Sequence, residues 1–456
     1  MKVSVIGCGL RTPLLLHGLV NADLGIDTVA LYDIDPNRSR LMQQMGASIA
    51  AKKPVRMMAS ATLEAAIRDS QFVINSVRAG NIEARMHDER LAFELGFAGQ
   101  ETTGPAGFAK ALRTIPIALE HARAVTDFAS GAWIVNFTNP AGIITQAIST
   151  YTKAKVVGIC DTPSELSFQI ARALSEPWQD VETDYFGLNH LGWMRAVRVR
   201  GEDRTEQLLG NDELLAGLYP ARLFPFPLIR SLRLIPTEYL FFYYEQRQAW
   251  ENQKRLGMTR GEELGVLNRD VLEALDAAVD GGNLEGALAT YRRYLNRRNA
   301  SYMRLDGAGE SAFAGEDAAW DPFEGATGYH RIAVDTIRAL SQREPRNVIL
   351  NVPNCTGPNC PAIDDLPTPD VVEVPCSTTS SGPIPQKIGH LPEAVRGLVI
   401  SVKTYERLTI QAAISRRWDA ATYALMQNPI VGSWSAAEQY VRRLAASGSE
   451  YFREFY

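Results

Sequence analysis

The chain contains 456 residues, of which 46% are hydrophobic and 22% are charged, and its net charge is −5. This composition is typical of a folded globular protein and excludes a disordered chain, and the scattered charges of both signs argue against a nucleic-acid partner. The segment Met1–Leu10 lacks the apolar core of a signal peptide, and no run reaches the roughly 18 apolar residues of a membrane span. We therefore expect a cytoplasmic protein that does not contact a membrane.

Short apolar runs alternate with helical stretches along the first third of the chain. The predicted strands are Met1–Gly7, Asp27–Asp33, Val55–Met58, Phe72–Val77, Trp133–Thr138 and Lys155–Cys160. The predicted helices among them are Pro13–Asn21, Ala61–Asp69 and Gly107–Ala129. Apolar strands that alternate with helices predict an α/β fold with a parallel, doubly wound sheet.

The pattern changes after residue 165. The predicted strands there are Asp184–Leu191, Met194–Arg200, Asn347–Asn351 and Val371–Pro375, and the predicted helices are Gly261–Ala278, Leu284–Arg298, Arg396–Ala413 and Trp418–Met426. The segment Asp306–Gly328 is rich in Gly, Ala and acidic residues and predicts a loop. We therefore expect two domains, an N-terminal doubly wound domain at residues 1–165 and a C-terminal α+β domain at residues 166–456.

The five cysteines are sparse and odd in number, which argues against a framework of disulfide bonds. Cys355 and Cys360 form the closest pair in the sequence. No second pair supplies the further ligands that a zinc site needs, so we expect a structural role for these two cysteines.

A glycine-containing turn, Gly7-Cys8-Gly9, follows the first predicted strand and precedes the first predicted helix. Glycines at this place let the backbone approach a pyrophosphate at the helix N-terminus, although the third glycine of the usual motif is absent. Asp33 lies 24 positions after Gly9, where a carboxylate binds the ribose hydroxyls and repels the 2′-phosphate of NADP. The sequence thus predicts a Rossmann-like, NAD-binding domain, and the alternative is a simple turn followed by a solvated aspartate.

Polar and reactive residues follow several of the predicted parallel strands, at the edge of the sheet where ligands bind. These residues are Gly7, Asp33, Arg78, Asn139, Cys160 and Asp161. Each of them alone also fits a turn or a helix cap, but their clustering predicts a binding site. We assign Gly7, Gly9, Asp33 and Arg78 to the cofactor.

A thiol and an imidazole near this edge indicate a possible metal centre. Cys160 ends an apolar strand, and His190 follows 30 positions later in the segment Gly187–His190. Such a pair can bind a divalent cation and leave positions open for substrate oxygens. The spacing alone favours an inert, buried cysteine, because no C-x-x-C or H-E-x-x-H motif is present.

Several short motifs are spread over nearly the whole chain. They are Ile82–Arg85, Asp88–Glu89, Gly99–Pro105, Ala111–Pro116, Asn136–Gly142, Gly187–His190, Thr259–Glu263, Val372–Cys376, Val402–Lys403 and Tyr405–Thr409. In this order they closely resemble glycoside hydrolase family 4, and most of all its 6-phospho-β-glucosidase branch. The resemblance implies an NAD- and divalent-metal-dependent hydrolase of carbohydrate metabolism. It also implies that the C-terminal domain contributes to substrate and metal binding and to assembly as a homodimer or homotetramer.

The family is an exception to glycoside hydrolysis by two carboxylates. The resemblance implies that tightly held NAD⁺ oxidises the C3 hydroxyl of a phosphorylated sugar, which acidifies the proton at C2. A base then removes that proton, and a divalent cation, usually Mn²⁺, stabilises the enediolate. The aglycone leaves from C1, water adds, and the cofactor returns its hydride.

Position by position, the resemblance implies that Cys160 and His190 are the metal ligands and that Tyr239 is the base. The alternative for Tyr239 is one aromatic residue of a packed helix face, because the segment Glu238–Tyr244 contains several aromatic side chains. A tyrosine with its ordinary pKa near 10 is a poor base, so we expect the nearby cation to lower that pKa.

Other residues match or depart from the family on the substrate side. Asn139, Arg85 and Glu101 match positions near the substrate and the nicotinamide. Arg11 departs from the usual glycine- and serine-rich turn, and it is a candidate for binding the substrate phosphate or the pyrophosphate, or else a surface charge. Asp161 stands where β-type enzymes usually carry Asn, so it is a candidate acid for the leaving group and keeps a 6-phospho-α-glucosidase as an alternative.

Two functions of other classes stay open at this point. A lactate- or malate-type dehydrogenase shares the cofactor domain, but it consumes NAD⁺ in proportion to its product and uses no metal. A non-enzymatic NAD sensor binds the cofactor and shows no metal-dependent hydrolysis.

Overall fold

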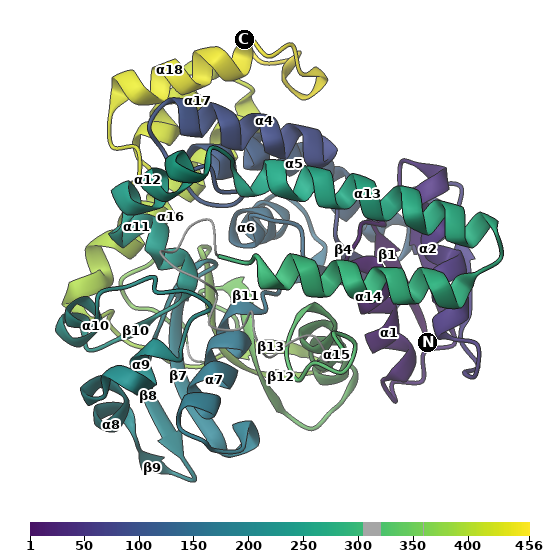
Figure 1. Ribbon diagram of the computed structural model, residues 1–456, viewed down its shortest axis with the longest axis horizontal. Coiled ribbons are helices and arrows are strands. Elements are labelled where there is room, and N and C mark those ends of the chain that lie inside the picture. Colours follow the sequence, from purple (N-terminus) through teal and green to yellow (C-terminus); the bar gives the residue numbers. More distant parts are fainter. Residues whose placement is uncertain (304–320, 359) are drawn as a thin grey trace.

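A computed structural model describes residues 1–303, 321–358 and 360–456. A mixed sheet runs through the centre of the molecule, and helices surround it (Figure 1). The strands are β1 (Lys2–Ile6), β2 (Thr28–Tyr32), β3 (Arg56–Ala59), β4 (Phe72–Asn75), β5 (Trp133–Asn136), β6 (Lys155–Gly158), β7 (Val181–Leu188), β8 (Leu191–Val199), β9 (Glu202–Asp203), β10 (Ile235–Pro236), β11 (Arg346–Pro353), β12 (Val371–Thr379) and β13 (Gly382–Pro385).

The helices cover both faces of this sheet. The α-helices are α1 (Thr12–Asn21), α2 (Pro36–Ile49), α3 (Leu63–Ile67), α4 (Asn81–Glu94), α5 (Gly104–Phe128), α6 (Ala141–Tyr151), α7 (Thr162–Ala173), α8 (Thr205–Gly210), α9 (Asp212–Ala216), α10 (Phe226–Leu232), α11 (Phe241–Tyr244), α12 (Gln246–Leu256), α13 (Arg260–Asp280), α14 (Leu284–Ala300), α15 (Tyr329–Ser341), α16 (Glu393–Ser415), α17 (Trp418–Met426) and α18 (Trp434–Ala445). Short 3-10 helices occupy Trp178–Asp180, Glu238–Leu240 and Glu450–Phe452. On one side α5 packs against α3, α6 and α16, and on the other α1 packs against α2 and α15.

The N-terminal strands pair in the order β3-β2-β1-β4-β5-β6, and every pair among them is parallel. This order is that of a Rossmann fold, in which the carboxyl ends of the strands share one edge and the chain direction switches at β1. The predicted fold class is therefore confirmed. The six predicted N-terminal strands are all present, and most end one or two residues earlier than we expected.

Strands from the second half of the chain extend the same sheet. β11 pairs with β6 through Asn351 and Gly158, and it pairs antiparallel with β12 along its whole length. β12 in turn pairs with β7 through Glu373 and Gly187. The two halves of the chain thus share one continuous sheet, and the domain boundary at residue 165 stays a prediction.

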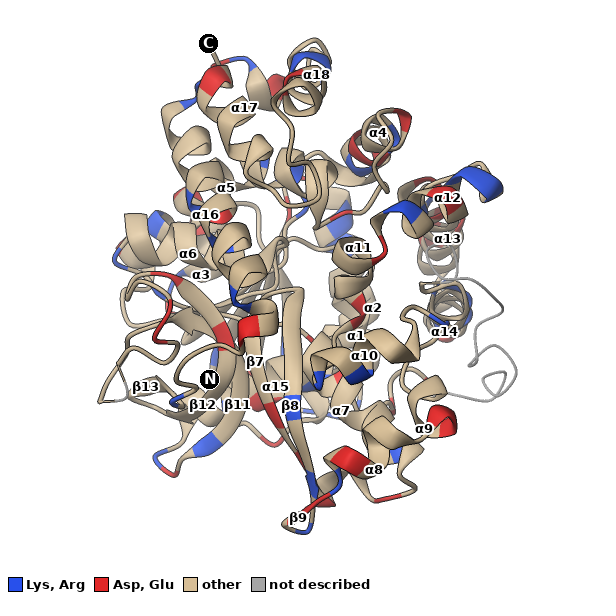
Figure 2. Ribbon diagram, turned by 90° about the vertical axis from the view of Figure 1, so that its left-hand side faces the viewer, with Lys and Arg blue, Asp and Glu red and all other residues tan. Residues whose placement is uncertain are grey.

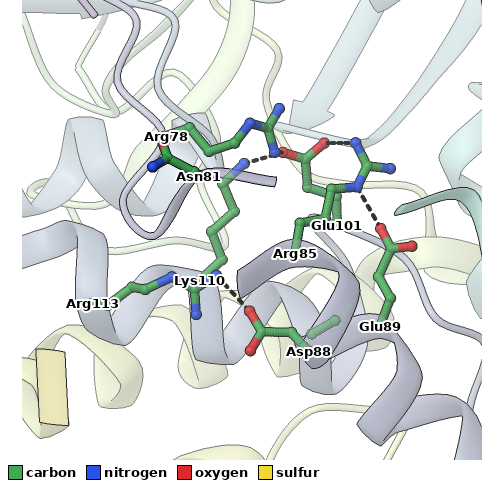
Figure 3. Close-up of a pocket in the computed structure, with 9 residues that line it drawn as sticks. Arg78, Asn81, Arg85, Asp88, Glu89, Glu101, Lys110 and Arg113 are labelled. Carbon is green, nitrogen blue, oxygen red and sulfur yellow. Dashed lines mark hydrogen bonds and ion pairs between the residues drawn. The ribbon is translucent and has the colours of Figure 1, made fainter. Parts of the chain in front are cut away.

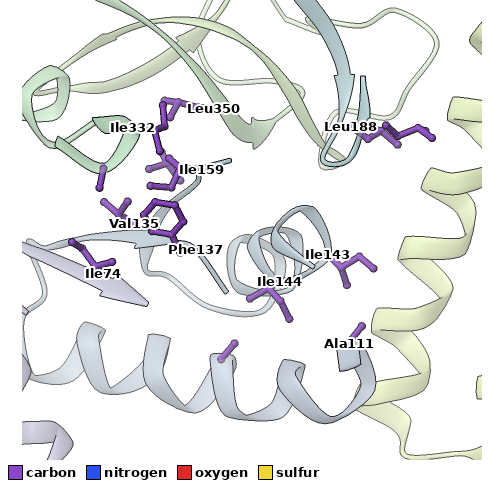
Figure 4. Packing of buried hydrophobic residues seen from close by; sticks show 14 of the residues in the cluster. Ile74, Ala111, Val135, Phe137, Ile143, Ile144, Ile159, Leu188, Ile332 and Leu350 are labelled. Carbon is purple, nitrogen blue, oxygen red and sulfur yellow. The ribbon is translucent and has the colours of Figure 1, made fainter. Parts of the chain in front are cut away.

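Apolar side chains fill the layers on both sides of the parallel strands. Figure 4 shows Ile74 of β4 and Val135 of β5 on the side of the cluster that carries Ile332 of α15, and Ala111 of α5 near Ile143 and Ile144 of α6. Ile74 and Val135 are fully buried. A strand covered by helices on both faces needs apolar residues at successive positions, which explains the uninterrupted apolar runs in the sequence.

The hairpin between β7 and β8 differs from our prediction. We expected a strand over Asp184–Leu191, but the strand ends at Leu188 and a turn at Asn189 and His190 follows. His190 adopts the left-handed conformation with φ of 60°, which is uncommon for a residue other than glycine. The prediction was wrong because strand propensity gives no information about this tight turn. The consequence is that His190 lies at the tip of a hairpin.

Cys355 and Cys360 form a disulfide, whereas Cys8, Cys160 and Cys376 are free. A structural role for the pair is thus confirmed in the form of a single local crosslink. Of the predicted loop Asp306–Gly328, residues 306–320 lie outside the described residues, and residues 321–328 contain no helix or strand.

None of the helices that the structure describes is long and apolar enough to cross a bilayer. Figure 2 shows positively and negatively charged residues mixed along helices such as α4 and α13, in keeping with the scattered charges of the sequence.

Candidate active site

The glycine turn after β1 is shaped to hold a ligand. Gly7 has φ of 90°, and a Cβ there would lie 2.6 Å from the carbonyl oxygen of Ser76, so only glycine fits between the ends of β1 and β4. A Cβ at Gly9 would meet nothing within 4 Å, which leaves open space at the start of α1. Both features fit a pyrophosphate at the topological switch point.

Asp33 lies at the end of β2, next to this turn. Its Oδ2 accepts a hydrogen bond from the backbone N–H of Cys8 at 2.7 Å, and its Oδ1 accepts one from Asp35 at 3.0 Å. The carboxylate is therefore fixed beside the glycine turn, as a ribose-binding group would be. The adjacent Ile34 is 90% exposed and offers an apolar surface for an adenine ring. The residues present thus fit a dinucleotide.

His190 contacts Thr102, a residue of the motif Gly99–Pro105, and Tyr239, the predicted base. Its Nδ1 lies 2.8 Å from the hydroxyl of Thr102, so Nε2 is the nitrogen that can bind a cation. Its ring stacks on Tyr239 with the centroids 3.7 Å apart and the planes 3° from parallel. Burial lowers the pKa of His190 to about 3, so the imidazole is neutral and its lone pair is available to a metal.

Cys160 follows β6 and precedes α7. Burial, together with the charges of Glu373 and Asp161, raises the pKa of its thiol well above the ordinary value, and hydrogen bonds from Thr162 oppose that shift. A cation bound to the sulfur would deprotonate it. Cys160 also interacts electrostatically with Tyr239, the residue that stacks on His190. The soft thiolate and the neutral imidazole form a donor set that suits a divalent transition-metal ion.

Two protein ligands would leave most of the coordination shell of such an ion open. Among the described residues no group of three or more His, Cys, Asp or Glu side chains is arranged to hold a metal. The further positions would therefore fall to water or substrate oxygens, as in a catalytic metal site.

Tyr239 belongs to a short hydrogen-bonded chain of buried polar groups. The Tyr302 hydroxyl approaches the Tyr239 oxygen at 3.5 Å and the Glu238 carboxylate at 3.1 Å. Burial and the charge of Glu238 raise the pKa of Tyr239 well above its ordinary value, and the hydrogen bond from Tyr302 opposes the shift. Burial also raises the pKa of Glu238 to about 7. Without a cation the fold therefore keeps Tyr239 as a neutral phenol.

Asp161 and Arg11 face each other across the carboxyl edge of the sheet. Their closest charged atoms are 3.8 Å apart, and the Arg11 guanidinium lies 3.6 Å from the centroid of the Tyr329 ring. Asn139 lies in the turn after β5, ahead of α6, and is half-buried. These three predicted substrate residues thus lie at the ends of β1, β5 and β6.

A buried ionic cluster surrounds Glu101 (Figure 3). Its carboxylate forms ion pairs with Arg78, Arg85 and Lys110, and the Arg85 contact measures 2.6 Å. Although burial favours the protonated acid, these three cations hold the pKa of Glu101 well below its usual range. Arg85 also contacts Glu89 at 2.7 Å. The structure therefore joins Arg78, predicted to bind the cofactor, with Arg85 and Glu101, predicted to lie near the substrate, in one cluster beside the cofactor turn.

Arg298 was not singled out in the sequence. It lies near the end of α14, a helix that contacts the glycine turn through a 2.6 Å hydrogen bond from the Tyr291 hydroxyl to the Leu10 carbonyl. Burial, aided by the charge of Arg11, lowers the pKa of Arg298 to about 10. It forms no ion pair with any residue that the structure describes. Two adjacent arginines at the end of a helix are usually a solvated cap, so no sequence signal marked it.

Glu373 was also missed, although it lies in one of the quoted motifs. It is 1% exposed and interacts electrostatically with Cys160. Its signal in the sequence is a charge inside the apolar run Val371–Val374, where burial on both faces of the sheet is expected.

Comparisons with known proteins identify the family. The model described as "Family 4 glycosyl hydrolase" matches residues 2–176, and the model of its C-terminal domain matches residues 185–431. A probable 6-phospho-β-glucosidase of Bacillus subtilis is 30% identical over 100% of this chain and 98% of its own length. A phospho-α-glucosidase of Clostridium acetobutylicum is 24% identical over 100% of this chain and 99% of its own.

Solved structures agree with these matches. The 6-phospho-β-glucosidase of Thermotoga maritima with NAD and glucose-6-phosphate has a TM-score of 0.83 at 29% identity, over 99% of both chains. A structure of the same enzyme with manganese, NAD⁺ and glucose-6-phosphate has a TM-score of 0.80, again at 29% identity and over 99% of both chains. Sequence models that cover nearly the whole chain and a shared fold lead to one conclusion: this chain belongs to the family 4 glycosyl hydrolases.

Proposed function

We propose that this protein hydrolyses 6-phospho-β-glucosides with the aid of bound NAD and a divalent cation such as Mn²⁺. The 6-phospho-β-glucosidase relatives support this substrate class, because they match at 30% identity whereas the phospho-α-glucosidase matches at 24%. The NAD, manganese and glucose-6-phosphate in the Thermotoga maritima structures support the cofactors and the phosphorylated sugar.

The chain's own residues would divide the work as follows. When bound, NAD accepts a hydride from the sugar and the divalent cation stabilises negative charge on the adjacent sugar oxygens. Cys160 and His190 would hold the cation. Tyr239 would remove the proton at C2, and a cation next to His190 would favour its phenolate over the neutral phenol. Asp161 would donate a proton to the departing aglycone oxygen.

Arg11 and Arg298 would bind the 6-phosphate. Their guanidinium groups repel each other in the absence of an anion, and Arg298 has no ion-pair partner among the described residues. A phosphate dianion between them would neutralise both charges and accept bidentate hydrogen bonds. Asn139, Arg85 and Glu101 would orient the sugar, while Gly7, Gly9, Asp33 and Arg78 would hold the cofactor.

One observation carries the proposal: the stacked pair of His190 and Tyr239 beside Cys160. Tyr239, the proposed base, thus contacts one proposed metal ligand and interacts electrostatically with the other, which follows β6 at the carboxyl edge of the sheet. A dehydrogenase of the lactate or malate kind has no use for a thiol at that place.

The decisive experiment is a panel of nitrophenyl α- and β-glucosides, with and without a 6-phosphate, assayed with NAD⁺ and Mn²⁺. We expect turnover of the β-6-phosphate alone, with NAD⁺ needed only in catalytic amounts. In D₂O, deuterium should appear at C2 of the released sugar. Stoichiometric NADH formation, or a product without deuterium at C2, would overturn the proposal.

Two variants test the assignment of the residues. Tyr239→Phe should abolish deuterium incorporation and lower turnover by about 10²- to 10⁴-fold, while NAD and Mn²⁺ still bind. Cys160→Ser should abolish Mn²⁺ binding and leave NAD binding unchanged. Normal Mn²⁺ retention in Cys160→Ser would remove Cys160 from the metal site.

We further propose that the protein acts in the cytoplasm as a homodimer or homotetramer. Light scattering of the purified protein would test the assembly, and a monomer would contradict it.

A further inference from the structure

The carboxylate of Glu373 is buried in the centre of the sheet and accepts hydrogen bonds from several side chains. The Tyr185 hydroxyl donates to its Oε2 at 2.5 Å. The side-chain amides of Asn351 and Asn189 donate to its Oε1 at 2.7 and 3.2 Å. Burial raises the pKa of Glu373, and these three hydrogen bonds oppose the shift because each of them favours the ionised form.

Glu373 and its hydrogen-bond partners connect the segments that carry the proposed metal ligands. A row of paired residues crosses the sheet and consists of Gly158, Asn351, Glu373 and Gly187. Gly158 precedes Cys160 by two positions, and Gly187 precedes His190 by three. Asn189, the neighbour of His190, accepts hydrogen bonds from the backbone N–H groups of Ala141 and Gly142 at 3.1 and 3.4 Å.

Asn189 therefore joins two parts of the site through one side chain. Its amide N–H group holds Glu373, and its carbonyl oxygen holds the N-terminus of α6, directly after Asn139. Glycines keep these contacts possible. A Cβ at Gly142 would lie 3.1 Å from Cβ of Asn189, and a Cβ at Gly192 would overlap the Tyr185 hydroxyl. The hydrogen bond between Asn189 and Glu373 thus fixes the hairpin tip that carries His190.

Within the part of the chain that the structure describes, no cation balances the charge of Glu373. No lysine, arginine or histidine forms an ion pair with it within the described ranges. Burying a carboxylate without a cation costs several kcal/mol, even after the protein has relaxed around it. A carboxylate that is paired with a cation avoids a cost of this order. The nearest proposed site for a positive charge is the one at Cys160, with which Glu373 interacts electrostatically.

We propose that Glu373 is a positioning residue of the metal site, which fixes the turn of His190 through Asn189 and strengthens divalent-cation binding through its buried negative charge. This inference rests on the proposed function for the identity of the site, but it concerns cation affinity and not the reaction. Second-sphere groups of this kind change metal affinity by about 10- to 100-fold when they are removed.

The test measures Mn²⁺ binding by calorimetry on the NAD-loaded protein, without substrate. We expect Glu373→Gln, which keeps the shape and removes the charge, to weaken Mn²⁺ binding about 10- to 100-fold. The dissociation constant of NAD should stay within about twofold, since the glycine turn is untouched. At saturating Mn²⁺ the variant should regain most of its turnover, which separates a positioning role from a catalytic one.

Glu406→Gln is the matched control. Glu406 is a buried carboxylate on α16 that is paired with Lys403, so its loss should lower the thermal stability and leave Mn²⁺ affinity within about twofold. If Glu373→Gln fails to fold, Glu373→Asp keeps the charge on a shorter side chain, and its Mn²⁺ affinity should stay within about tenfold of the wild type.

The outcomes separate the two proposals. Unchanged Mn²⁺ affinity in Glu373→Gln, or an equal loss in Glu406→Gln, would overturn the role of Glu373 in an enzyme that still hydrolyses its substrate. A folded Glu373→Asp that loses Mn²⁺ would also overturn it. If the Mn²⁺ affinity falls in Glu373→Gln as expected but the wild type hydrolyses none of the panel, the proposed function alone is refuted.

Discussion

Two buried carboxylates near the candidate site are stabilised in opposite ways. Glu101 is surrounded by Arg78, Arg85 and Lys110, so its charge is more than balanced within the protein (Figure 3). Among the described residues Glu373 receives hydrogen bonds from neutral donors only, which are Tyr185, Asn189 and Asn351. The first cluster is electrostatically complete without a ligand, whereas the second leaves a negative charge for a cation to balance.

Glu165 shows a third solution. It receives one hydrogen bond, from the Thr327 hydroxyl at 2.7 Å, and burial raises its pKa to about 7. Because Glu165 has a single hydrogen-bond donor and no ion-pair partner among the described residues, protonation is the remaining way to bury the group. The number and charge of the neighbours thus decide whether a buried carboxyl serves as a structural anion, an anion that favours a metal, or a neutral acid.

The largest effect should be on the free energy of unfolding when the ionic cluster around Glu101 is broken. Glu101→Gln would leave Arg78, Arg85 and Lys110 together with only the contact from Arg85 to Glu89 to balance them, and we expect the free energy of unfolding to fall by about 3–5 kcal/mol in the absence of ligands. Urea denaturation measures it. The control is Glu64→Gln, which removes a 49% exposed partner of Arg68 and should cost less than about 1 kcal/mol. Equal losses in the two variants would show that the Glu101 cluster is no more than a surface network.

A second prediction concerns the reverse case, two neighbouring cations of which Arg11 has only a 3.8 Å contact to Asp161 and Arg298 has no ion pair with a described residue. Arg11→Ala should raise KM for a 6-phosphorylated substrate about 10- to 100-fold, the loss of one or two charge-assisted hydrogen bonds. Arg298→Ala should act in the same direction, and Arg297→Ala, the exposed neighbour, should change KM less than about twofold.

The dissociation constant of NAD distinguishes the two anions that Arg11 can reach. It should not change in Arg11→Ala, because the phosphate of the sugar is the proposed partner. Weaker NAD binding with an unchanged KM for substrate would move Arg11 to the pyrophosphate.

The sequence was a good guide to the parallel half of the fold. Each strand there is covered by helices on both faces, so its side chains form a continuous apolar run, and the glycine turn after β1 is a local feature. The position of Asp33 follows from the same local pattern. What pattern analysis missed depends on contacts between distant segments, such as the pairing of β11 with β6 and of β12 with β7.

The candidate site divides in the same way. Cys160 and Asp161 follow a strand end and could be found from the chain itself, whereas the assignment of His190 and Tyr239 needed the family resemblance. Their stacking joins a hairpin tip to a 3-10 helix nearly 50 residues away, which no local pattern encodes. Glu373 could have been found, because a charge within a buried strand requires an explanation.

The smallest expected effect is a change of stability with pH at Glu165. Its pKa is about 7 in the folded protein and lies near its ordinary value of 4.5 in the unfolded chain. Between these values the unfolded chain releases a proton that the folded protein keeps, so the stability of the wild type falls as the pH rises through this window and is constant above it. Glu165→Gln cannot ionise, and its stability relative to the wild type should rise from pH 4.5 to pH 8. Because the side chain is only half-buried and solvent screens its charge, we expect a rise on the order of 1–2 kcal/mol, less than the full difference of the two pKa values would give. Thr327→Val, which removes the hydroxyl donor, should extend the fall of stability to higher pH, because the folded acid then holds its proton more tightly. If the difference in the free energy of unfolding between Glu165→Gln and the wild type is independent of pH, Glu165 is ionised in the folded protein. Protonation would then not explain how this carboxyl is buried beside the site.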